Sequence, residues 1–93
     1  MALTKAHIAA ATELGATVET HHGSTVRVSN GSDEFGQVKP YNSGQWLAEI
    51  RKADAGDLIR YAGIWSSKQD AIHEAAFEIA EPSVREQYLE LNQ

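Results

Sequence analysis

Four histidines are the residues of this 93-residue chain most suited to metal binding or proton transfer. His21 and His22 are adjacent at a predicted hairpin tip, and neighbouring strand residues point to opposite faces, so the two chelate poorly together. His7 and His73 each stand alone on a predicted helix, with no second histidine or glutamate three or four residues away. The spacing favours surface histidines and predicts no metal site.

Catalytic signatures of other kinds are also missing from the sequence. The chain has no cysteine, no Gly-x-Ser-x-Gly turn and neither of the common glycine-rich phosphate loops. The loop acids Asp33, Glu34, Asp54 and Asp57 do not have the alternating spacing of a calcium loop. We therefore expect a non-enzyme with no catalytic residues and no cofactor. A small hydrolase would need a bound metal or a perturbed carboxylate pair.

The overall charge narrows the classes of partner. Eight basic and thirteen acidic residues give a net charge of −5, which argues against nucleic-acid or anionic-membrane binding by the whole surface. No run of about eighteen apolar residues or signal-peptide pattern occurs. Hydrophobic residues make up 42% and charged residues 23%, as in a globular chain. We expect one compact domain, residues 1–93, in the cytoplasm.

The negative charge is concentrated near the C-terminus. From Ser67 to Gln93 two bases stand against six acids, a balance of −4, whereas residues 1–66 hold six bases and seven acids, a balance of −1. A solvated helix face is the ordinary reason for such a pattern, and a docking surface for a basic partner is the functional one. The predicted partner-binding residues are Asp70, Glu74, Glu78 and Glu81, with Asp33, Glu34 and Tyr41 as loop contacts.

A second candidate surface is basic. Arg27, Arg51 and Arg60 fall on predicted strands, and if they share the outer sheet face they can contact phosphates. This alternative predicts a small DNA- or RNA-binding domain.

Local patterns define the elements that must position these residues. Thr4 can cap a helix over residues 5–14, Gly15 can end it, and Ile8, Ala11 and Leu14 are its expected buried stripe. The alternation of apolar and polar residues predicts a hairpin of strands 16–21 and 24–29 around His22-Gly23. A long turn over 30–45, with a short strand at 35–38, is expected to follow. Two further strands are predicted at 46–51 and 58–62.

The C-terminal third is predicted to be helical. Ser66 and Ser67 are both suitable caps for a helix that carries Ile72, Ala75 and Ile79 at helical spacing and ends at Pro82. Ser83 and Glu86 repeat the capping pattern before a short helix that reaches about Leu91. The fold class is therefore α+β (α-β-β-(β)-β-α-α): an antiparallel sheet of three to four strands, with the N-terminal helix and a C-terminal helix on one face and the other face partly open.

Aromatic residues divide into expected core and expected contact residues. Trp46, Tyr61 and Phe77 are predicted to be in the core, with Ile59 pointing inward beside Tyr61. Trp65 and Tyr41 are the candidates for exposed contacts, because tryptophan and tyrosine contribute much of the binding energy of interfaces.

One stretch carries a resemblance to DNA-binding domains. Trp46 to Arg51, then Arg60 to Ser67, then the capped alanine-rich helix from Asp70 resemble the strand–strand–helix of AP2-like and integrase arm-type domains, over about 35 of the 93 residues. In that family basic strand residues enter the major groove, which implies such a role for Arg51 and Arg60, although these strands are not rich in lysine and arginine. The order of elements also looks like that of double-stranded-RNA-binding domains, without their basic helix start.

The general character of the chain resembles small phage-encoded accessory proteins, of which anti-CRISPR inhibitors are one class. In that group an acidic surface often blocks the basic, nucleic-acid-binding surface of a bacterial effector. The resemblance implies a protein-binding inhibitor whose partner is basic, with a CRISPR effector subunit as one candidate. Homodimerisation through an exposed sheet edge or through Val84, Tyr88 and Leu91 stays open.

Overall fold

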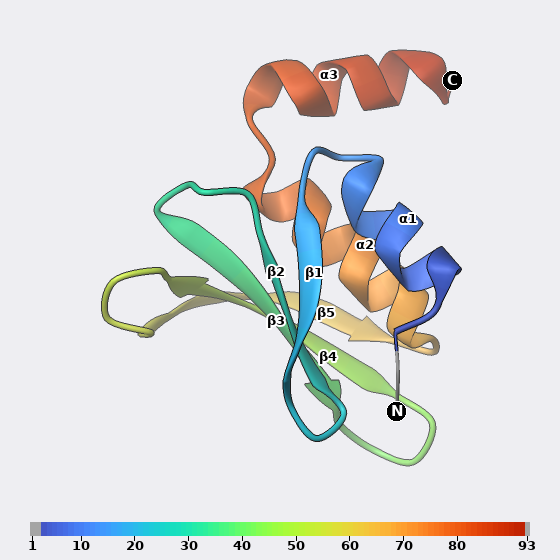
Figure 1. The fold of residues 1–93 in the computed structure, drawn as a ribbon, viewed down its shortest axis with the longest axis vertical. Coiled ribbons are helices and arrows are strands. Elements are labelled where there is room, and N and C mark those ends of the chain that lie inside the picture. Colours follow the sequence, from blue (N-terminus) through green and yellow to red (C-terminus); the bar gives the residue numbers. More distant parts are fainter. Residues whose placement is uncertain (1–2, 93) are drawn as a thin grey trace.

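The computed structural model describes residues 3–92, which form one five-stranded antiparallel sheet and three helices (Figure 1). The elements are α1 (Lys5–Thr12), β1 (Thr17–His22), β2 (Thr25–Ser29), β3 (Glu34–Pro40), β4 (Trp46–Lys52), β5 (Leu58–Trp65), α2 (Lys68–Ile79) and α3 (Pro82–Leu91). The strands lie side by side in sequence order, each joined to the next by a turn. The α+β prediction is confirmed, with five strands where three to four were expected.

The extra strand content comes from the segment predicted to be a long turn. β3 has seven residues and pairs with both β2 and β4, so it is the central strand of the sheet. The prediction of a mostly irregular 30–45 segment is therefore wrong, and only short turns remain at its two ends. Gly36 and the polar Gln37 weaken the strand signal, but pairing on both sides stabilises a strand regardless of its own propensity.

Helix α1 begins as predicted, and two of the three residues of its predicted buried stripe, Ala11 and Leu14, are buried. Thr4 Oγ1 accepts a hydrogen bond from the His7 backbone N–H at 3.1 Å, and His7 Nδ1 accepts one from the Thr4 N–H at 3.2 Å. The helix ends at Thr12, two residues earlier than expected. Ile8 is 45% exposed, contrary to prediction, because α1 turns Ala10 toward the core in its place.

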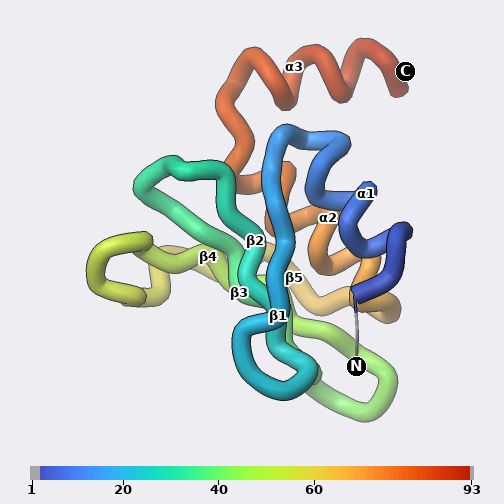
Figure 2. Tube along the Cα trace, in the orientation of Figure 1, coloured from blue at the N-terminus to red at the C-terminus, as the bar shows by residue number. Residues whose placement is uncertain are grey.

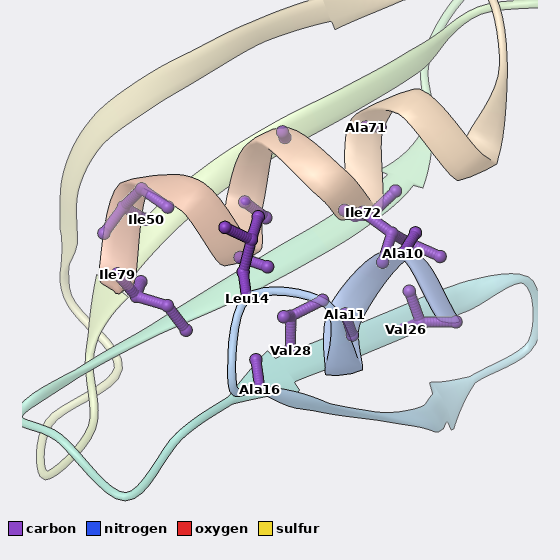
Figure 3. Close-up of a cluster of buried hydrophobic side chains, with 14 residues drawn as sticks. Ala10, Ala11, Leu14, Ala16, Val26, Val28, Ile50, Ala71, Ile72 and Ile79 are labelled. Carbon is purple, nitrogen blue, oxygen red and sulfur yellow. The ribbon is translucent and has the colours of Figure 1, made fainter. Parts of the chain in front are cut away.

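The core lies between one face of the sheet and the pair α1 and α2 (Figures 1 and 2). Figure 3 shows Ala71, Ile72 and Ile79 of α2, Ala10 of α1 and Leu14 just after α1 directed toward Val26, Val28 and Ile50 of the strands. The many alanines let α2 approach the sheet closely. A Cβ atom added at Gly36 of β3 would lie 2.7 Å from the Cβ of Ala75.

Two bulges in the edge strand β5 reverse the predicted orientation of its side chains. Tyr61 is paired with Glu49 and Arg60 with Ile50, while Ile59 and Ala62 are skipped by the register. A one-residue slip moves a side chain to the other face. Tyr61 is thus 63% exposed and Ile59 38% exposed, so their predicted inward placement is wrong. Trp46 and Phe77 do pack partly against the core, as does Trp65, predicted to be an exposed contact.

The helices α2 and α3 differ in how firmly they are attached. α2 is capped by Ser67, whose hydroxyl accepts a hydrogen bond from the Asp70 N–H at 3.1 Å. α3 projects from the body in Figures 1 and 2, and Glu81 precedes it without a side-chain cap, so the predicted Ser83 cap is not formed. Tyr88 attaches α3 by packing its ring 5.0 Å from that of His73. Within residues 3–92, no helix is long and apolar enough to cross a membrane.

Candidate functional site

Carboxylates from two distant segments converge on Arg60. Its Nε donates to Glu78 Oε1 of α2 at 2.9 Å, and its Nη2 lies 3.3 Å from Glu34 Oε1 at the start of β3. The same Nη2 donates to the backbone carbonyl of Glu78 at 3.2 Å. One guanidinium therefore joins the helix and loop acids that the sequence predicted as a common surface.

A backbone contact holds the loop in this position. Asn30 Nδ2 donates to the carbonyl of Ile79 at 2.9 Å, which satisfies an orphan acceptor at the end of α2 and fixes the β2–β3 turn beside it. We call the carboxylates of this turn, of the second half of α2 and of the residue before α3 the acidic end: Asp33, Glu34, Glu74, Glu78 and Glu81. Of these five, only Glu34 and Glu78 form ion pairs with Arg60 within residues 3–92. Lys52 lies opposite Glu34 across the strands but forms no ion pair within residues 3–92.

Glu74 is the carboxylate whose titration reports this crowding. Burial raises the pKa of Glu74, and repulsion from Glu78, one helical turn away, raises this pKa further. The folded protein thus binds a proton at Glu74 at higher pH than the unfolded chain. Stability should fall as the pH rises through this window, because the charged form is disfavoured in the fold.

Glu74→Gln should therefore stabilise the protein at pH 7. We expect a gain of about 0.5 kcal/mol, the usual cost of like charges four residues apart on a helix. The gain should shrink as the pH falls through the raised pKa of Glu74, because the wild-type carboxyl is then neutral too. Urea unfolding at several pH values measures this, and a Glu90→Gln control should show no such trend. A pH-independent difference would contradict the assignment.

Arg60 is not on the outer sheet face where the nucleic-acid alternative requires it. The bulges turn it toward α2, so it cannot share a surface with Arg27 and Arg51, and this part of the prediction is wrong. The hydrogen bond to Glu78 raises the pKa of Arg60 above its ordinary value against the effect of burial, and the hydrogen bond to Glu34 adds to this rise. The guanidinium therefore serves to neutralise part of the acidic end.

Arg60→Gln should destabilise the fold modestly. The variant loses two ion pairs and leaves Glu34 and Glu78 without their counter-charge, but the Arg60 side chain is 39% exposed, so solvent screens the loss. We expect about 1 kcal/mol in urea unfolding at low salt. High salt should shrink the difference, whereas a salt-independent loss would indicate a packing role.

Two of the predicted partner-binding residues lie apart from the acidic end. Asp70 lies in the first turn of α2, eight residues before Glu78, where a negative charge interacts favourably with the helix dipole. Tyr41 is 53% exposed in the β3–β4 turn. It lines an open cavity of about 410 Å³ on the outer sheet face with Leu47, Tyr61 and Ile64. The predicted partner-binding residues therefore lie in three separate places: the acidic end, the first turn of α2 and the outer sheet face.

The outer sheet face also holds a buried acid that sequence reasoning missed. Glu49 is 3% exposed, with Oε1 at 3.2 Å from Lys39 Nζ and 3.3 Å from Arg51 Nη2. Lys39 on the adjacent strand β3 and Arg51 two residues along β4 make this burial possible, since a buried charge needs partners. The only available signal was its place between two apolar residues of β4.

The structure brings together no three metal-ligating side chains within residues 3–92. Comparison with protein-family models, with curated proteins and with solved structures finds no match to the chain. The candidate site is therefore defined by its own geometry, with Arg60 at its centre and the acidic end around it.

Proposed function

We propose that the protein is a non-enzymatic binding module that attaches its acidic end to a basic, nucleic-acid-binding partner protein and blocks it. The observation that supports this most is the meeting of the loop and helix carboxylates at Arg60. In this proposal the chain acts in the cytoplasm as an inhibitor of the phage anti-CRISPR kind, and a bacterial CRISPR effector subunit is one candidate partner.

The negative charge of the acidic end is only partly neutralised within the protein. Arg60 forms ion pairs with Glu34 and Glu78, and within residues 3–92 no ion pair reaches Asp33, Glu74 or Glu81. Crowding by Glu78 and burial already disfavour the charged form of Glu74. A guanidinium or ammonium group from a partner relieves this repulsion on binding. The negative electrostatic potential of the acidic end also speeds association with a basic surface and repels acidic proteins.

Capture of partners from a nuclease-treated bacterial lysate tests this function. The immobilised protein should retain a basic, nucleic-acid-binding protein at low salt and release it at high salt, because the contact is electrostatic. Nuclease treatment removes proteins that are held through nucleic acid. The proposal is overturned if no basic protein is retained, or if the retained proteins disappear once the lysate is treated with nuclease. The charge-reversal comparison in the Discussion then locates the contact.

A further inference from the structure

A basic cavity lies on the outer sheet face, on the side away from α1 and α2. Its volume is about 210 Å³, and its lining comes from four strands and the β4–β5 turn. The lining residues are His21, Arg27, Phe35, Gln37, Arg51 and Gly56. None of these is acidic, although the protein as a whole has a charge of −5.

Arg27 is the cation in this cavity that remains available to a ligand. Its guanidinium carbon lies 3.8 Å from the centroid of the Phe35 ring, a cation–π contact that fixes the plane of the side chain. Glu19 lies opposite Arg27 in the strand register, yet no ion pair joins them within residues 3–92. Five guanidinium N–H groups are thus held in place over an aromatic ring with no carboxylate acceptor.

Arg51 forms a second, more rigid side of the cavity. Its Nη1 donates to the Gly56 carbonyl at 2.7 Å and its Nη2 to Glu49 Oε1 at 3.3 Å. Its Nε is buried and has no hydrogen-bond partner within the described residues. The Arg51 guanidinium is therefore fixed by Gly56 and Glu49, and it contributes its positive charge to the cavity wall.

We propose that this cavity binds a phosphoryl group. The Arg27 guanidinium, the Gln37 amide and the His21 imidazole line the cavity beside the positive charge of Arg51. A phosphoryl group, with three acceptor oxygens and up to two negative charges, fits this set of donors better than a carboxylate with two oxygens and one charge. The site is independent of the acidic end, because Arg60 lies on the opposite face of the sheet. Its ligand carries the phosphoryl group either as a small phosphate ester or within a nucleic-acid backbone.

Titrations followed by amide chemical shifts test the site with three probes in phosphate-free, low-salt buffer. The probes are inorganic phosphate, adenosine 5′-monophosphate and a ten-nucleotide single strand of thymidines. Shifts at residues 21, 27, 37 and 51 with the first two identify a phosphate-ester site. Shifts with the oligonucleotide alone identify a backbone phosphate of nucleic acid. No shift with any probe overturns the proposal.

Matched variants separate the site from general electrostatics. Arg27→Gln should weaken binding at least about tenfold, the usual effect of a lost charge-assisted hydrogen bond. Arg85→Gln on α3 removes the same charge and should leave affinity unchanged. Glu19→Gln should tighten binding about twofold, because it removes a negative charge that lies opposite Arg27 in the strand register and repels a phosphate. Equal losses in Arg27→Gln and Arg85→Gln overturn the proposal. If Arg27→Gln unfolds, two other variants test the proposal. Arg27→Lys should bind the phosphate probe more weakly than the wild type, and Glu19→Gln should bind it more tightly.

Discussion

Gly36→Ala is expected to destabilise the protein by about 2 kcal/mol, the typical cost of adding a methylene to a packed core. The new Cβ would lie 2.7 Å from the Cβ of Ala75 and 3.6 Å from its Cα, so α2 or the central strand β3 must shift. The backbone of Gly36 does not have the positive φ of the six other glycines, and lack of space is therefore the cause. The midpoint of urea unfolding measures the effect.

A second substitution distinguishes this cause from a general loss of glycine. Ala75→Gly removes the opposing methyl group and by itself should cost about 1 kcal/mol, since glycine is a poor helix former. The double variant Gly36→Ala/Ala75→Gly should lose about 1 kcal/mol less unfolding free energy than the sum of the losses in the two single variants. Strict additivity would mean that the two positions do not compete for the same space.

Reversal of charge at Glu74 and Glu81 is expected to abolish most binding to a basic partner. These two positions leave the ion pairs of Arg60 with Glu34 and Glu78 intact, so the fold around Arg60 is retained. For an arginine-rich peptide of ten residues, we expect the affinity of the Glu74→Lys/Glu81→Lys protein to fall about 10- to 100-fold at low salt, as for close charge pairs at interfaces. Isothermal titration calorimetry measures this.

The matched control reverses two acids elsewhere. Glu86→Lys/Glu90→Lys makes the same change on α3, and both variants move the net charge from −5 by four units to −1. Electrostatics of the whole molecule should therefore affect both equally. A local site predicts that the control loses much less affinity than the variant at the acidic end. Equal losses would show that only net charge matters.

The helices were predictable because their signals are local. Thr4 and Ser67 cap α1 and α2 as expected, and each needs only a backbone N–H three residues away. The alternation of Val26 and Val28 likewise identified the first hairpin and its buried face. Such features depend on residues close in sequence, so one sequence is enough to find them.

The placement of Arg60 could not be predicted, because it depends on the register between two strands. The bulge at Ile59 moves Arg60 to the helix side and Tyr61 to the outer side, and no glycine or proline next to Ile59 marks that bulge. The sequence identified the acidic residues of the acidic end, but not that their two segments meet. Its geometry depends on contacts between Asn30 and α2 and between Arg60 and Glu34, which are distant in sequence.

The most direct measurement is the map of amide chemical-shift changes when the arginine-rich peptide is added to the wild-type protein. We expect the largest changes at residues 33–34 and 74–81, around the Arg60 ion pairs. Changes that are largest at residues 86–92 of α3, or that spread evenly over all exposed acids, would contradict this expectation.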